Sequence, residues 1–117
     1  MSVAREQELQ FHNIQQFWEF YVTQHSKAPT RWWHFAGTAS AVLLLFTAIA
    51  SAAWWLVPLG IVLGYACAWY SHFFIEGNKP ATFGHPLWSF ACDWRMFALM
   101  LGGKMDAEVS RIVKSRR

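Results

Sequence analysis

The stretch that decides the fold is WWHFAGTASAVLLLFTAIASAAWWLVPLGIVLGYACAWYSHFFI, residues 32–75. It contains no Asp, Glu, Lys or Arg, and its flanking charges are Arg31 and Glu76. A transmembrane α-helix needs about 20 apolar residues, so these 44 residues are too many for one span and suit two. We therefore expect a hairpin of two transmembrane helices at about 33–52 and 55–74.

Aromatic and small residues support this hairpin. Tryptophans at 32, 33, 54 and 55 mark the ends of the first span, as interfacial anchors do. The turn is expected near 51–58, with Pro58 in the first turn of the second helix. Gly60, Gly64 and Ala68 form a small-residue ridge that permits close helix approach in lipid. This ridge is compatible with packing inside the hairpin and with a homo-oligomer.

The bulk composition agrees with a membrane protein. Hydrophobic residues make up 55% and charged residues 15% of the 117 residues, whereas soluble domains carry about 25% charged residues. The net charge is +3, but the basic residues form no stripe with interleaved aromatics. We therefore expect membrane lipid as a partner and no nucleic acid.

Three further segments flank the hairpin. Apolar residues at three- and four-residue steps predict an amphipathic helix over 4–25, and Pro29 predicts a break over 26–30. A third apolar segment at 86–103 contains Asp93 and Arg95. A lone crossing there would bury both charges, so we favour an interfacial helix or one packed on the hairpin; a further crossing is the alternative.

The remaining stretches are a loop over 75–85 and a basic tail or polar helix over 104–117. The fold class that follows is all-α, a single integral membrane domain over 1–117 built on the hairpin. It would lie in the inner membrane of a bacterium or the endoplasmic reticulum of a eukaryote.

Four of the five histidines flank the hairpin: His25, His34, His72 and His85. Because the two spans run antiparallel, His34 near the start of the first and His72 near the end of the second should lie at the same membrane depth. Imidazole suits iron, zinc, copper and nickel. A shared metal would also give each buried ring a partner for one nitrogen. The alternative is that each ring only hydrogen-bonds a carbonyl or headgroup.

Five other residues are candidates for supporting roles. Glu76 is four residues after His72, so on a continuing helix the two share a face, and Glu76 could bind the metal or orient an imidazole. Asn78 lies in turn-like sequence, and Tyr65 lies on the helix face of His72. Arg31 and Lys79 could pair with a substrate carboxylate, or only report topology.

Several motifs together resemble the 2-hydroxy fatty acid dioxygenase family, over roughly residues 15–105. The specific part is the run from His72 through Glu76, Asn78 and Pro80 to His85-Pro86 and Trp88, preceded by His25, Arg31 and His34. The resemblance implies an Fe(II) enzyme that uses O2 to convert 2-hydroxy fatty acids into fatty acids one carbon shorter. It also implies His25, His34, His72 and His85 as the catalytic iron ligands, in a site facing the cytoplasm.

Two other functions use the same residues. A zinc-dependent lipid hydrolase would use these histidines without O2. A non-enzymatic membrane scaffold would need no metal. HExxH, a Gly-rich phosphate loop and a GxSxG elbow are all absent from the sequence.

Overall fold

The computed structural model describes residues 11–80 and 84–115, and every element in these residues is helical. The elements are α2 (Ile14–Thr23), α3 (Ala28–Ser51), α4 (Leu56–Ser71), the π-helix η1 (His72–Glu76), α5 (Pro86–Leu101) and α6 (Met105–Ser115). The chain forms two compact units. The hairpin unit is Lys27–Pro80, and the terminal unit contains α2, α5 and α6.

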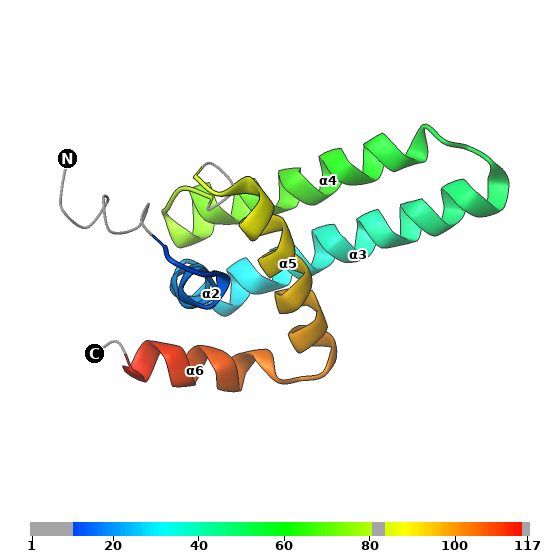
Figure 1. The fold of residues 1–117 in the computed structure, drawn as a ribbon. Coiled ribbons are helices and arrows are strands. Elements are labelled where there is room, and N and C mark those ends of the chain that lie inside the picture. Colours follow the sequence, from blue (N-terminus) through cyan, green and yellow to red (C-terminus); the bar gives the residue numbers. More distant parts are fainter. Residues whose placement is uncertain (1–10, 81–83, 116–117) are drawn as a thin grey trace. The chain divides into compact units, whose positions relative to one another are not determined.

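The hairpin unit consists of α3 and α4, which lie antiparallel and side by side (Figure 1). Both helices are long and apolar enough to cross a membrane, with spans of Ala28–Ser51 and Leu56–Glu76. Small residues set their separation. A Cβ added to Gly37 would lie 2.9 Å from the Cβ of Cys67, and one added to Gly60 would lie 3.2 Å from the Cα of Ala41. The predicted ridge on α4 therefore packs inside the hairpin.

The predicted break over 26–30 is wrong in its position. Helix α3 already begins at Ala28, and Pro29 lies in its first turn. Proline is tolerated there because the first N–H groups of a helix have no intrahelical acceptor. The chain instead leaves helical geometry between Gln24, which caps α2, and Lys27, which caps α3.

The second span ends in a π-helical turn rather than in the loop expected from residue 75. The N–H groups of Gly77 and Asn78 both donate to the carbonyl oxygen of His72, at 2.8 and 2.9 Å. Gly77 takes φ +76°, a left-handed conformation that glycine adopts without strain. Together these features reverse the chain directly after Glu76.

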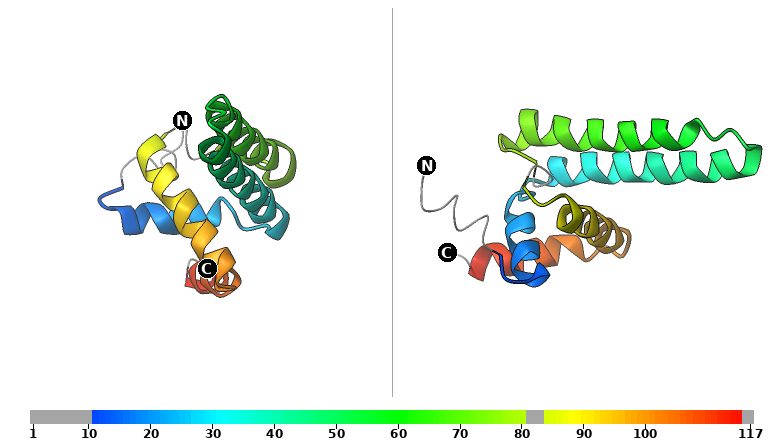
Figure 2. Two further views of the ribbon diagram at one scale, coloured as in Figure 1. Left: turned by 90° about the vertical axis from the view of Figure 1, so that its right-hand side faces the viewer. Right: turned by 45° about the horizontal axis from the view of Figure 1, so that its top comes forward.

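The terminal unit packs around large side chains from α2, α5 and α6, and Figure 2 shows the three helices running in different directions. Helix α2 begins at the cap residue Asn13, whose side chain accepts from the N–H of Gln16 at 2.9 Å. The core consists of Phe17, Trp18, Tyr21, Val22, Cys92, Met96, Met105 and Ile112. The predicted N-terminal helix is seen from Ile14 to Thr23, and its first residues lie outside the described part.

Helix α5 carries its two charges into contacts within the terminal unit. Asp93 accepts a hydrogen bond from Tyr21, and Arg95 pairs with Glu108 at 3.9 Å. At 16 residues α5 is shorter than the roughly 20 that a span needs. The charges thus have protein partners, as expected for a helix that does not cross alone. Residues Met105–Ser115 of the predicted tail form the helix α6.

Candidate metal centre

The hairpin brings two of the predicted histidines into contact. The Nε2 atoms of His34 on α3 and His72 at the end of α4 lie 3.1 Å apart, and both side chains are buried. The antiparallel helices (Figure 1) place them at one end of the hairpin, at the same level along it. Gly37, one helical turn after His34, permits the close helix approach that this contact needs.

Asn78 determines which nitrogen of His72 carries a proton. Its Oδ1 atom lies 2.6 Å from Nδ1 of His72, and an amide oxygen can only accept. Nδ1 therefore holds the proton, and the lone pair of a neutral His72 lies on Nε2, facing His34. The π-turn produces this contact, since on a continuing α-helix Asn78 would point to a different side.

Glu76 connects the end of the second span to the start of the first. Its Oε1 atom accepts from the N–H of Lys27 at 3.2 Å and from the hydroxyl of Thr30 at 2.7 Å. A carboxylate at this position also complements the positive end of the α3 dipole. These contacts connect Glu76 to the first turn of α3, and its role as a ligand or as a support of an imidazole stays a prediction. The role of Thr30 was not predicted from the sequence, because its partner Glu76 lies 46 residues away along the chain.

His25 lies directly after α2, in the terminal unit. Its Nδ1 atom lies 2.7 Å from the carbonyl oxygen of Tyr21, and its ring stacks on the Tyr21 ring at 4.0 Å. A carbonyl only accepts, so Nδ1 is protonated and Nε2 holds the lone pair of the neutral ring. His25, His34 and His72 are all buried and could each supply one imidazole nitrogen to a metal ion.

The fourth predicted ligand, His85, lies in an aromatic cluster of the terminal unit. Its ring stacks on Trp88 at 5.6 Å and contacts Phe17 and Phe11 at 5.1 and 5.3 Å. His85 is also the cap residue before α5. Its role as a ligand stays a prediction.

The remaining predicted residues belong to the hairpin unit. Arg31 is buried and lies one turn before His34 on α3. Tyr65 lies two turns before His72 on α4, with its ring 6.0 Å from that of Trp69. Lys79 is exposed just after Asn78. Their predicted roles toward a substrate remain predictions.

A partly buried Tyr21–Asp93 pair lies next to His25 and was not singled out as part of the site. Burial, followed by the nearby Asp93, raises the pKa of Tyr21 well above its usual value, so Tyr21 stays protonated and donates. Burial raises the pKa of Asp93 to about 7. The available sequence signal was an acidic residue inside an apolar segment, which requires a partner.

Comparison with known proteins identifies the family. A family model described as 2-hydroxy-palmitic acid dioxygenase Mpo1-like matches residues 11–105. The chain belongs to the Mpo1-like family. This confirms the resemblance inferred from the motifs, and the family description is that of a dioxygenase of a 2-hydroxy fatty acid. No curated protein and no solved structure matches the chain.

Proposed function

We propose that this Mpo1-like protein is an Fe(II)-dependent dioxygenase that converts 2-hydroxy fatty acids into fatty acids one carbon shorter. The observation that carries the proposal is the His34–His72 pair in a chain of this family. We propose His25, His34 and His72 as metal ligands, and His85 as a fourth on its sequence position. Imidazole nitrogen is a suitable donor for iron.

The His34–His72 separation fits two ligands of one ion. Two nitrogens about 2.1 Å from a common ion, with an angle of 90–110° between them, would lie roughly 3.0–3.4 Å apart. The Nε2 atoms are 3.1 Å apart. His72 presents a lone pair toward His34 because its Nδ1 atom donates to Asn78. Asn78 would then orient the ligand from behind, as partners of metal-bound histidines commonly do.

The chain connection supports His25 as the third ligand. The N–H of Lys27 bonds to Glu76 inside the hairpin unit, and His25 precedes Lys27 by two residues. Two residues span at most about 7 Å, so the backbone of His25 lies within this distance of Lys27. The contact of its Nδ1 atom with the Tyr21 carbonyl places the lone pair of the neutral His25 ring on Nε2.

The reaction balances without a further reductant. A 2-hydroxy acid and O2 give the acid one carbon shorter, CO2 and water. The substrate carbons lose four electrons, and these reduce O2 completely. The carbinol carbon becomes the new carboxyl, and the bond to the old carboxyl breaks. Bound iron would supply the redox chemistry that O2 requires, which zinc lacks.

The hairpin's own residues would position the substrate. We propose that Arg31, one turn from His34, pairs with the substrate carboxylate, assisted by Lys79. The acyl tail would lie along the apolar outer surface, where Phe73 and Phe74 directly follow His72 and are 49% and 76% exposed. A site at the end of the hairpin would let the tail remain in lipid while the polar head reaches the histidines.

Metal analysis with a product assay tests the proposal. The purified full chain should contain near-stoichiometric iron and convert 2-hydroxypalmitic acid and O2 into the 15-carbon acid. His72→Ala should lose both iron and product, while His12→Ala, an exposed histidine outside the motif, should keep both. Bound zinc with O2-independent lipid hydrolysis would establish the hydrolase instead. No bound metal, with only stability affected in His34→Ala and His72→Ala, would establish the scaffold.

A further inference from the structure

We propose that α5 lies in the plane of the membrane interface and places its apolar face in lipid. This apolar face consists of Leu87, Phe90, Ala91, Trp94, Ala98 and Leu101. It is an interaction surface of the terminal unit that goes beyond the proposed function, because it involves neither the metal nor the reaction.

The apolar face runs along the whole length of α5. Its residues lie on one side of the helix, because positions three, four and seven apart share a side. All six residues are exposed. The large ones are exposed by 83% at Leu87, 54% at Phe90, 42% at Trp94 and 65% at Leu101. An exposed apolar stripe of this length is typical of a surface that contacts a membrane or another protein.

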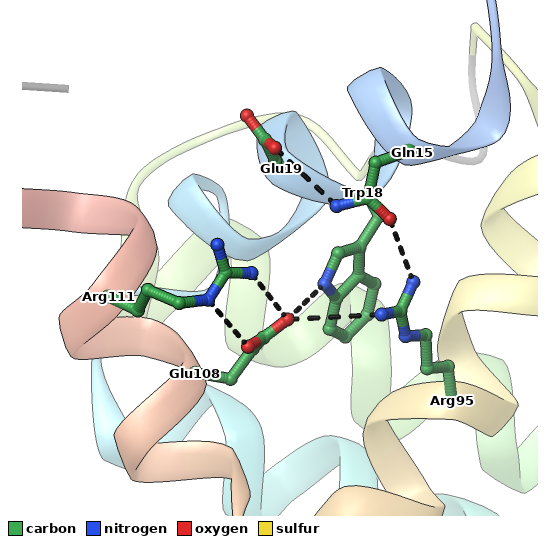
Figure 3. A network of polar contacts seen from close by, with 6 residues as sticks. All are labelled: Gln15, Trp18, Glu19, Arg95, Glu108 and Arg111. Atoms are coloured by element: carbon green, nitrogen blue, oxygen red, sulfur yellow. Dashed lines mark hydrogen bonds and ion pairs between the residues drawn. The ribbon is translucent and has the colours of Figure 1, made fainter. Parts of the chain in front are cut away.

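The charged side chains of α5 are instead bound to the other helices of the terminal unit. Asp93 accepts a hydrogen bond from Tyr21 on α2. Arg95 donates to Gln15 on α2 at 3.5 Å and pairs with Glu108 on α6 at 3.9 Å (Figure 3). A surface helix in water keeps its charges toward solvent and its apolar stripe toward the core. Because α5 gives its charges protein partners and leaves an apolar stripe exposed, this stripe is suited to a surrounding other than water.

Three features indicate lipid as the occupant of the apolar face. Trp94 near its centre contacts Phe90 edge-on, with ring centroids 6.2 Å apart, and tryptophan is enriched at membrane–water interfaces. Gln24, which caps α2, precedes Lys27, which caps the potential span α3, by a backbone reach of at most about 11 Å. The terminal unit is therefore tethered to a helix that can span a membrane. Exposed Lys104 follows α5, and a lysine beside apolar surface reaches headgroups with its long stem.

The length of α5 favours a position along the membrane surface. Its 16 residues are fewer than the roughly 20 that a span needs. An amphipathic helix in the interface buries its apolar face by about 5–10 Å. Leu87 and Leu101 lie near opposite ends of α5, about 21 Å apart along its axis. A helix in the plane of the interface holds both residues at one depth, whereas a crossing helix would place them at very different depths.

Nitroxide labels on single cysteines test both the surrounding and the depth. The full chain is placed in phosphatidylcholine vesicles with Leu87→Cys, Phe90→Cys or Leu101→Cys, each combined with Cys67→Ala. The other native thiol, Cys92, is buried, and burial raises its pKa to about 12, so it stays unlabelled. Electron paramagnetic resonance then measures collisions of each label with O2, which enters lipid, and with a water-soluble nickel chelate.

Two exposed positions supply the references. Ser110→Cys on α6 represents water, and Phe46→Cys on the outer surface of α3 represents lipid. The ratio of O2 to chelate collisions at all three α5 positions should be several-fold higher than at Ser110. The labels at Leu87 and Leu101 should report the same depth, shallower than that at Phe46.

Three results would overturn the proposal. Chelate collisions as frequent as at Ser110 would mean that the apolar face lies in water. Rare collisions with both reagents would mean that protein covers it: a second copy if the spectra broaden at high protein-to-lipid ratio, and this chain itself if they do not. A lipid-like ratio with very different depths at Leu87 and Leu101 would establish a crossing helix. Since no metal or product enters these measurements, the proposed function and the membrane contact of α5 can fail independently.

Discussion

The two units of this chain are built in opposite ways. In the hairpin unit the buried positions are small or polar, such as Gly37, Thr30 and Ser71, while large apolar side chains such as Phe46 and Val62 are more than 60% exposed. The terminal unit instead has a core of large aromatic and aliphatic side chains, such as Phe17, Trp18 and Ile112, that are fully buried. The hairpin is therefore suited to a surrounding of lipid, where helices pack through small residues, whereas the terminal unit is held together by a core of large apolar side chains.

This contrast shows where each unit obtains its stability. Helices in lipid gain little from burying apolar side chains, because the lipid tails are as apolar as the protein. The hairpin therefore depends on close backbone contact, and a single added methyl group affects it. The terminal unit depends on the apolar area removed from water, so it is most sensitive to truncation of a large side chain.

The largest expected effect is truncation of Phe17 in the terminal unit. Phe17 is fully buried, so Phe17→Ala should lower the free energy of unfolding of this unit by about 3–5 kcal/mol. Phe46→Ala removes the same side chain from the outer face of α3 and should change stability in detergent by less than about 1 kcal/mol. Hydrogen exchange measured peptide by peptide checks both variants. Equal losses in the two would contradict the contrast between the units.

The next effect concerns the closest contact of the hairpin. A Cβ at Gly37 would lie 2.9 Å from Cβ of Cys67 and 3.0 Å from the carbonyl oxygen of Gly64, so Gly37→Ala should force α3 and α4 apart. Such overpacking costs about 1–3 kcal/mol. The His34–His72 pair, one turn away, should bind metal more weakly. Iron titration together with hydrogen exchange over α3 and α4 measures both effects.

Gly64→Ala is the matched control for this variant. A Cβ at Gly64 would meet its nearest neighbours at 3.6 and 4.0 Å, which is ordinary van der Waals contact. Alanine also favours a helix by up to about 1 kcal/mol over glycine. Gly64→Ala should therefore keep metal binding and leave stability unchanged or slightly higher. A loss equal to that of Gly37→Ala would show that glycine composition alone, rather than the close contact, matters.

The hairpin was predictable because a long uncharged run has few structural solutions. The expected spans, 33–52 and 55–74, differ from the observed α3 mainly at its start, where Pro29 was read as a breaker and instead occupies the first turn. Antiparallel topology alone then predicted that His34 and His72 would lie at the same depth, and the structure brings them into contact. These inferences need only local pattern and chain connectivity.

The supports of the site could not be predicted in this way. The π-turn that returns Asn78 to His72 has no periodic signal, and spacing on a regular helix does not place those residues together. Tyr21–Asp93 and Trp18–Glu108 join residues 72 and 90 positions apart. Nothing local in the sequence specifies such pairs, although Asp93 in an apolar segment indicated that some partner was needed.

The smallest expected effect is a pH dependence confined to the terminal unit. Hydrogen bonds from Arg111 and then Trp18 lower the pKa of Glu108. A carboxylate with a lowered folded pKa stabilises the unit fully above its ordinary pKa of about 4.3, and this contribution is lost as the pH falls through the folded value. Because the Arg111 pair is exposed to solvent, we expect at most about 1 kcal/mol, or a few degrees in Tm.

Glu108→Gln isolates this effect. The wild type should lose more Tm than Glu108→Gln between pH 5 and pH 3. The raised pKa of Asp93 acts on both proteins alike and cancels in their difference. The same comparison over α3 and α4 should show no difference, since residues 32–75 contain no carboxylate. An equal acid loss in both proteins would mean that Glu108 holds Trp18 by position alone, and that its charge adds nothing to the stability of the terminal unit.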